Sequence, residues 1–271
     1  MFTNITVGQY YPTQSAIHNL DPRLKLVSVL AFMILLFIVN NFWGFIFTAV
    51  WISIIIKISR VPALFFLRGL RGILFILLFT ATLNAFLTPG ETVLFQFLAL
   101  RITLEGLSLA GTMAFRLCLL IIGSSILTLT TSPIELTDAL EYLMKPLKRI
   151  GVPAHEIAMM MTIALRFIPT LMEEMEKIMK AQAARGADFV TGGIIKRARG
   201  LIPLLVPLFI SSFRRADDLA MAMEARCYRG DVNRTRLKAL KLTSLDYSVI
   251  PILCLYPAGV FALNMLPQLL S

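Results

Sequence analysis

Five long runs of apolar residues divide this sequence, and their length limits the folds open to the chain. A helix that crosses a bilayer needs about 17–25 predominantly apolar residues, and several runs lie near the short end of that range. Hydrophobic residues make up 57% of the chain and charged residues 15%, against about 25% charged in a soluble domain. The sequence therefore predicts an all-α integral membrane protein with about five transmembrane helices. The predicted spans cover residues 24–39, 42–56, 73–87, 104–130 and 249–266.

The distribution of Lys and Arg orients these spans. Basic residues lie at the start of the first span and fill the connection between the second and third, whereas Arg101 is the only Lys or Arg in residues 40–41 and 88–103. Because cytoplasmic loops carry the excess of Lys and Arg, we predict a multi-pass protein with a cytoplasmic N-terminus. The same rule accounts for the net charge of +10 without a nucleic-acid partner. The basic residues concerned are Arg23, Lys25, Lys57, Arg60, Arg68 and Arg71.

A long segment between the fourth and fifth spans contains most of the remaining charged residues, so we predict that it forms a cytoplasmic arm of amphipathic helices. Within it, the stretch from Ser132 to Glu135 has the form of a capping box and should start a helix, which Pro146 should kink. The predicted domains are an N-terminal membrane domain of four spans at residues 1–130, the arm at residues 131–245, and a C-terminal transmembrane helix at residues 246–271.

Two long helices follow in the arm, predicted at residues 153–186 and about 194–226. Proline at the start of a helix and glycine just past its end are typical of helix boundaries. The helices end in similar tripeptides, whose arginines would either complement the negative helix pole, worth about 0.3–1 kcal/mol each, or bind a partner through the guanidinium. Spacing alone leaves both roles open. The tripeptides are Ala184-Arg185-Gly186 and Ala225-Arg226-Cys227.

The sequence contains no motif typical of catalysis or nucleotide binding. No G-x-x-x-x-G-K-[ST] is present to hold phosphates, and G-x-S-x-G and H-E-x-x-H are also absent. The cysteines at 118, 227 and 254 lie far apart, and the chain has two histidines, so no metal site is predicted. We therefore predict a protein that is not an enzyme and has no cofactor of its own.

One candidate intramembrane pair lies in the fourth predicted span. Arg116 falls near the middle of this span, where an ionised side chain must face protein or a wet cavity. Glu105, three turns earlier, could share its helix face. A functional role for the pair and a purely structural one both stay open.

Several segments, in order, resemble a known family. Residues 20–26 read Leu-Asp-Pro-Arg-Leu-Lys-Leu, which is similar to the Asp-Pro-Arg-x-Lys stretch that enters the first span of the transmembrane T component of energy-coupling factor (ECF) transporters, the EcfT/CbiQ family. The two arginine tripeptides fall where that family has two Ala-Arg-Gly motifs at the ends of its cytoplasmic coupling helices. The resemblance covers essentially the whole chain and is nearest to the shared-module type. The N-terminal motif residues are Asp21, Pro22, Arg23 and Lys25.

The resemblance implies a coupling subunit of an ATP-driven importer of vitamins or other micronutrients in the bacterial cell membrane. In that family the two motifs dock on two ABC-type ATPases, which bind ATP and Mg, and the membrane face holds a substrate-binding S component. By carry-over, Arg185 and Arg226 would each anchor one ATPase, and the alanines before them would permit close contact. Cys227 stands where the family has Gly, which leaves open whether this helix ends there or runs on to Gly230.

A self-contained secondary membrane transporter is the alternative. Such transporters are commonly built from inverted repeats with paired broken helices at the substrate site. Five spans interrupted by one arm show neither feature, so the sequence favours the coupling subunit. An intramembrane enzyme would need a nucleophile or metal set, which the sequence does not supply.

Overall fold

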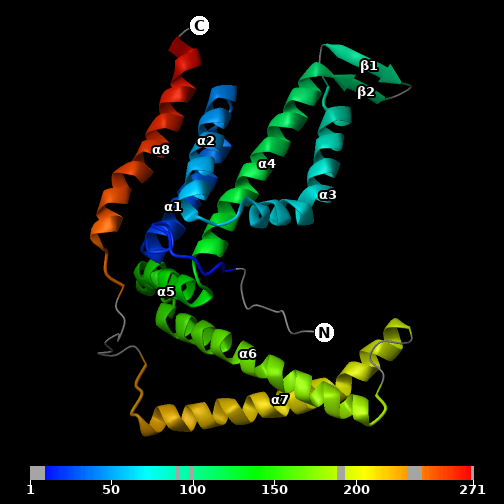
Figure 1. The fold of residues 1–271 in the computed structure, drawn as a ribbon, viewed down its shortest axis with the longest axis vertical. Helices are drawn as coiled ribbons and strands as arrows, with labels where there is room; N and C mark the ends of the chain where they lie inside the picture. The colour runs from blue at the N-terminus through cyan, green and yellow to red at the C-terminus, as the bar shows by residue number, and fades with distance from the viewer. Residues whose placement is uncertain (1–9, 90–91, 98–99, 188–192, 231–239, 270–271) are drawn as a thin grey trace. The chain divides into compact units, whose positions relative to one another are not determined.

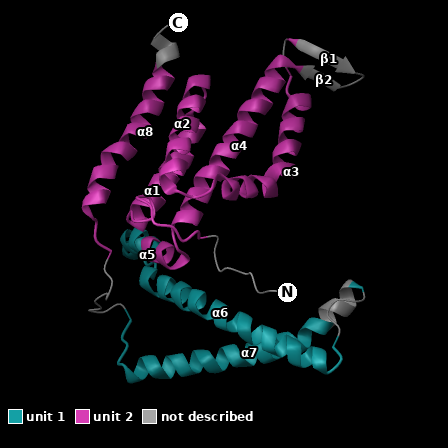
Figure 2. Cartoon of the chain, in the orientation of Figure 1, with its two compact units in different colours: residues 1–8, 140–239 teal, residues 9–139, 240–271 magenta. Residues whose placement is uncertain are grey.

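The computed structural model describes residues 10–89, 92–97, 100–187, 193–230 and 240–269. The chain divides into two compact units (Figure 2). The membrane unit comprises residues 9–139 and 240–271, and the helical unit comprises residues 140–239 together with 1–8. The three predicted domains divide the chain by its location in the membrane or the cytoplasm, whereas these two units divide it by internal contacts. The three domains therefore stay a prediction.

Within the described part of the chain, five long helices form most of the membrane unit (Figure 1). Helix α4 packs against α1, α2 and α3, and α8 packs against α1 and α2. The predicted all-α membrane fold is confirmed, and the last span in sequence lies beside the first. The helices are α1 (Pro22–Ile38), α2 (Phe42–Ser59), α3 (Ala63–Leu87), α4 (Leu104–Thr130) and α8 (Ser244–Leu269).

Among the described residues, four helices are long and apolar enough to cross a membrane: α2, α3, α4, and α8 over Ser244–Met265. Helix α1 has 17 residues, and at 1.5 Å per residue it rises about 26 Å, slightly less than the hydrocarbon core of about 30 Å. Its exposed side chains are nevertheless apolar, and Ile34 and Phe37 are 65% and 60% exposed. The first of the five predicted spans is therefore a short helix with an apolar outer face.

Two segments differ from the prediction. Helix α3 begins at Ala63, ten residues before the predicted span at 73, because Pro62 pre-sets the helix start and the residues after it are largely apolar. The connection between α3 and α4, predicted as a loop, contains an antiparallel hairpin of β1 (Val93–Phe97) and β2 (Leu100–Thr103). The aromatic and β-branched residues of these strands favour extended structure, a signal that the apolar-run interpretation did not use.

The core of the membrane unit lies where α1, α2, α4 and α8 meet. Leu36 and Val39, at the end of α1, have no exposed surface, and Val260 of α8 is 1% exposed. The ring of Phe32 on α1 lies so close to Gly123 on α4 that a Cβ at this glycine would overlap it. Small residues permit such close approach of helices in membranes.

The predicted capping box starts α5 (Pro133–Met144). The Glu135 backbone N–H donates to Ser132 Oγ over 3.3 Å, and the Ser132 N–H donates to the Glu135 carboxylate over 3.1 Å. The α-helix ends before Pro146 and continues as a short 3-10 helix, η1 (Lys145–Ile150). The predicted interruption at this proline is confirmed.

Helices α6 (Ala154–Ala184) and α7 (Ile194–Ala225) closely match the two predicted long helices. They pack against each other within the helical unit, and Arg215 of α7 donates to the Glu174 carboxylate of α6 over 2.8 Å. A hydrogen bond from Ser211 and the adjacent Arg215 guanidinium lower the pKa of the Glu174 carboxyl. This polar contact holds α6 and α7 together near the middle of both helices.

Candidate functional site

The first arginine tip closes α6 with a Schellman motif. Arg185 is the C-cap, and Gly186 follows it with a φ of 84°. The Gly186 N–H donates to the Ala183 carbonyl over 3.0 Å, and the Ala187 N–H donates to the Gln182 carbonyl over 3.0 Å. These two bonds satisfy carbonyls that a helix end would otherwise leave without partners.

The second arginine tip closes α7 in the same way. Arg226 is the C-cap, and Cys227 follows it with a φ of 53°. The Cys227 N–H donates to the Glu224 carbonyl over 2.8 Å, and the Tyr228 N–H donates to the Met223 carbonyl over 3.0 Å. The two helices therefore end in the same hydrogen-bonded turn, although one has Gly and the other Cys at the left-handed position.

The end of α7 decides between the two predicted endings. The helix stops at Ala225 rather than running on to Gly230. A left-handed conformation costs a non-glycine residue roughly 1–2 kcal/mol, and the two hydrogen bonds of the turn offset part of that strain. Cys227 is exposed and occupies the backbone conformation that glycine would adopt.

The two tips lie at opposite ends of α6. Tyr228, just past the second tip, donates its hydroxyl to the Met159 sulfur over 3.1 Å, near the start of α6. Arg185 is 26 residues further along this helix, which corresponds to about 39 Å at 1.5 Å per residue. In Figure 1 the C-terminal ends of α6 and α7 lie on opposite sides of the helical unit.

The surface of both tips is accessible. All six residues of the two tripeptides are exposed. A guanidinium can form two parallel hydrogen bonds with a carboxylate, and an alanine beside it lets a partner backbone come close. Arg185 and Arg226 also lie at the negative poles of their helices, so their position fits both roles predicted from the sequence.

The N-terminal motif forms the start of α1. Asp21 is the N-cap, its carboxylate accepts a hydrogen bond from the Arg23 N–H over 2.9 Å, and Pro22 occupies the first helical position. Aspartate and proline are favoured at these two positions. Asp21 is 5% exposed and Lys25 is 7% exposed, so the motif is largely buried inside the membrane unit.

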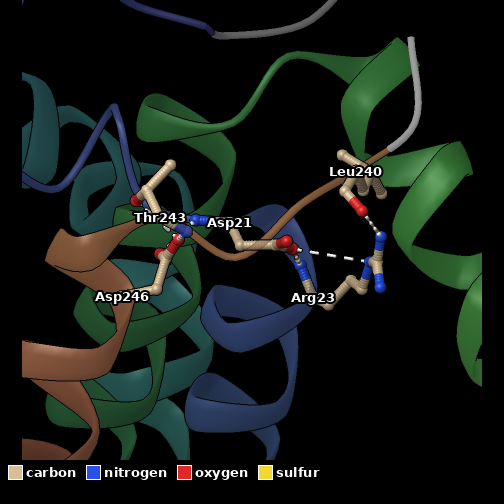
Figure 3. A network of polar contacts seen from close by, with 5 residues as sticks. All are labelled: Asp21, Arg23, Leu240, Thr243 and Asp246. Atoms are coloured by element: carbon tan, nitrogen blue, oxygen red, sulfur yellow. Dashed lines mark hydrogen bonds and ion pairs between the residues drawn. The ribbon is translucent and has the colours of Figure 1, made fainter.

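Asp246 joins this motif to the start of α8 (Figure 3). Its carboxylate accepts hydrogen bonds from the Asp21 N–H over 2.8 Å, from the Thr243 N–H over 2.6 Å and from the Thr243 hydroxyl over 2.8 Å. Arg23 Nη2 donates to the Leu240 carbonyl over 2.7 Å, and its Nε lies 3.6 Å from Asp21 Oδ1. The first turns of α1 and α8 are thereby fixed to each other.

Lys25 extends this network to the end of α4. Its Nζ donates to the His18 carbonyl over 2.9 Å and to the Thr130 carbonyl over 3.1 Å. Thr130 is the last residue of α4, and a lysine near a helix C-terminus stabilises carbonyls that have no intrahelical partner. We call the connected set the joint. It consists of Asp21, Arg23, Lys25, Thr130, Leu240, Thr243 and Asp246.

The sequence motifs predicted the α1 half of the joint but not its α8 half. Thr243 and Asp246 have the [ST]-x-x-[DE] spacing of a capping box before an apolar run, and this signal predicts a helix start at 244. It does not reveal that the same carboxylate binds Asp21, because the two aspartates are 225 residues apart.

The candidate pair in α4 is not brought together. Arg116 Nη2 donates to the Val39 carbonyl over 2.6 Å and to the Asn40 side chain over 3.3 Å, whereas the Glu105 carboxylate accepts from the Thr92 hydroxyl over 2.9 Å. Eleven residues separate Glu105 from Arg116, which is about 16 Å along a helix. Arg116 therefore supplies a hydrogen-bond donor to the backbone at the buried end of α1. This contact corresponds to the structural one of the two roles predicted for Arg116. Two aromatic rings, of Phe37 and Phe45, flank its guanidinium.

In the residues that the structure describes, no group of three or more His, Cys, Asp or Glu side chains is placed to hold a metal ion. The polar contacts described above are mainly helix caps and bonds from side chains to backbone carbonyls, together with the ion pair between Arg215 and Glu174. Together they define a class: a multi-span helical membrane protein with a helical unit that presents two exposed arginine tips.

Comparison with known proteins identifies the family. Residues 13–237 match the family described as cobalt transport protein, CbiQ. The energy-coupling factor transporter transmembrane protein EcfT of Thermosediminibacter oceani is 58% identical over 242 residues, which are 89% of this chain and 91% of the relative. The proteins of the same name from Clostridium kluyveri and Macrococcus caseolyticus are 58% identical over 248 residues (91% and 92% of the two chains) and 45% identical over 265 residues (98% and 99%). The chain belongs to this family and is a transmembrane component of an ECF transporter.

Proposed function

We propose that this chain is the coupling subunit of an ATP-driven importer of vitamins or other micronutrients in the bacterial cell membrane. Its two tips would each dock on one of two ABC-type ATPases, and its membrane-facing surface would hold a substrate-binding S component. The repetition supports this most: two helices end in the same turn with arginine as the C-cap, about 40 Å apart. Two copies of one motif at this separation fit two copies of one docking surface, one on each ATPase.

The chemistry of the tips is consistent with docking. Arg185 and Arg226 would each pair with a carboxylate on an ATPase, and Ala184 and Ala225 would leave room for the partner's backbone. Removing one partner of a buried charge pair typically costs about 2–5 kcal/mol of binding. A helix-dipole role is worth only about 0.3–1 kcal/mol, so the size of the effect separates the two roles.

Helix α7 supports contact with an apolar partner as well. Around its middle, α7 exposes a row of large apolar side chains, and exposed apolar surface of this kind marks a membrane or protein interaction site. A membrane-embedded S component has such a surface to offer. The exposed residues are Leu201, Ile202, Leu205, Val206, Phe209, Ile210 and Phe213.

In this proposal the chain itself contributes no catalytic residue and no cofactor. ATP and Mg bind to the partner ATPases, and the chain passes their motion to the S component. The tips and the N-terminus then lie on the cytoplasmic side, where the ATPases are. This orientation follows from the excess of Lys and Arg in the short connections on that side.

Capture of the complex on the tagged chain tests the tips. The double change Arg185→Ala with Arg226→Ala should release the ATPases and abolish ATP-dependent uptake of a panel of radiolabelled vitamins into vesicles. Each single change should slow uptake. Arg226→Lys should retain more uptake than Arg226→Ala but less than the wild type, because an ammonium lacks the planar two-bond fork. Arg226→Glu should reduce uptake more than Arg226→Ala does.

Arg214→Ala is the matched control, since Arg214 is also an exposed arginine on α7 but lies away from its end. This variant should bind the ATPases as the wild type does. If the double variant retains both ATPases and uptake at the level of this control, the arginines are only helix caps. Uptake by the purified chain without ATPases would instead support a self-contained secondary transporter.

A further inference from the structure

Two side chains of the N-terminal motif bind backbone carbonyls on either side of the helical unit in the sequence, one nine residues before the chain leaves the membrane unit and one where it re-enters that unit. Lys25 binds the Thr130 carbonyl at the end of α4, and Arg23 binds the Leu240 carbonyl ahead of α8. We call Thr130 the outgoing root and Leu240 the return root. Residues 140–239 of the helical unit lie between these two roots in the sequence, and both roots lie within the membrane unit.

Each of these two hydrogen bonds provides a donor to a backbone carbonyl that has no hydrogen-bond donor within a helix or strand. The carbonyl of Thr130 belongs to the last turn of α4, where carbonyls have no intrahelical donor. Residues 240–243 form neither helix nor strand, so the Leu240 carbonyl depends on contacts outside regular structure. Hydrogen bonds from a charged donor are shorter and stronger than neutral ones. The two basic side chains therefore restrain both roots more firmly than water could.

The spacing of the motif explains how one helix reaches both roots. Arg23 and Lys25 are two residues apart in the first turn of α1, which places them about 200° apart around the helix axis. Asp21 and Pro22 fix where this first turn begins. The bond from Asp21 to Asp246 then ties the first turn of α8 to the same point. Three helices, α1, α4 and α8, thus meet at one motif.

We propose that Arg23 and Lys25 are positioning residues that fix both roots to α1, so that a displacement of the helical unit moves α1, α4 and α8 together. Without them, the chain would bend at the roots and the displacement would be lost before it reached the spans. This proposal rests on the proposed function, because it assumes that motion enters through the helical unit. It assigns the Asp-Pro-Arg-x-Lys motif a mechanical role inside the chain rather than a partner-binding role.

A distance measurement tests the joint directly. Spin labels at Ile134 and Leu242, both exposed and close in sequence to the two roots, should give a narrow distance distribution in the complex captured on the wild-type chain. Arg23→Met and Lys25→Met, singly and combined, should broaden it. Lys57→Met is the matched control, because Lys57 is an exposed basic residue at the end of α2, and it should leave the distribution narrow.

Transport supplies the second measurement. In the double variant we expect uptake of radiolabelled vitamins per ATP hydrolysed to fall about tenfold, a typical size for coupling between two sites, while the ATPases stay bound and the complex stays monodisperse. A merely structural role would change the amount of complex but not this ratio. If the double variant does not fold, Arg23→Met decides the matter alone, because it leaves the Lys25 contacts in place.

Two results would overturn the proposed role of Arg23 and Lys25. One is a narrow distance distribution in the Arg23→Met variant, and the other is an unchanged ratio of uptake to ATP hydrolysis in a variant whose distance distribution is broad. Failure of the proposed function looks different. In that case the wild-type chain would not retain the ATPases, and the distance distributions measured on the purified chain alone would still decide whether the two basic residues fix the roots.

Discussion

The left-handed conformation of Cys227 gives a prediction whose size follows from the backbone. Gly186 and Cys227 occupy equivalent positions in the two tips, with φ of 84° and 53°. Changing Cys227→Gly removes strain, Gly186→Cys introduces it, and Cys227→Val increases it, since a β-branched residue resists positive φ. No atom of the described chain lies near a Cβ built at Gly186, so strain rather than a clash determines the outcome there.

The expected free-energy changes are small and opposite in sign. A left-handed L-residue costs roughly 1–2 kcal/mol relative to glycine, so Cys227→Gly should stabilise the closing turn of α7 by about 1 kcal/mol. Gly186→Cys should destabilise the turn of α6 by a similar amount. Since 1.4 kcal/mol is a factor of ten, each change should alter the stability of its turn by about fivefold.

Hydrogen exchange measures the stability of this turn at individual residues, because the amide N–H groups of Cys227 and Tyr228 are the donors that close the turn. Their protection should rise about fivefold in Cys227→Gly and fall in Cys227→Val. Protection at Ala187, in the other tip, should not change in either variant. Equal protection in the Gly and Val variants would refute the left-handed assignment and would mean that α7 continues through position 227.

Three further predictions concern topology, packing and pH. In a cysteine-free background, an impermeant thiol reagent added to intact cells should label Pro89→Cys but not Ala181→Cys, and the reverse labelling would contradict the predicted orientation. Gly123→Leu should destabilise the membrane unit by about 1–3 kcal/mol in thermal unfolding, because the Phe32 ring must move; an unchanged unfolding temperature would contradict the close approach. Because the pKa of Glu174 is lowered from 4.5 in the folded chain, its contribution to stability is present above pH 4.5 and is lost as the pH falls through the lowered value. In Glu174→Gln the acid-side fall of the unfolding temperature should be correspondingly shallower, and an identical fall would exclude this contribution.

Local features of the sequence determined most of the helices. The apolar runs identified α2, α4 and α8, because a bilayer demands a minimum apolar length. The capping box at Ser132 and the proline and glycine near residues 153 and 186 located the starts and ends of α5 and α6, because capping depends on residues within one turn. The family of the chain was predicted from the same local motifs in their order.

Tertiary structure decided what the buried charged groups do. Arg116 binds the end of α1 rather than Glu105, and Lys25 binds the end of α4, a partner 105 residues away. No spacing rule reaches across such distances, because these contacts exist only once the spans have packed. The conformation of Cys227 was likewise open in the sequence: strain disfavours it, and only the two hydrogen bonds of the closing turn make it the end of α7.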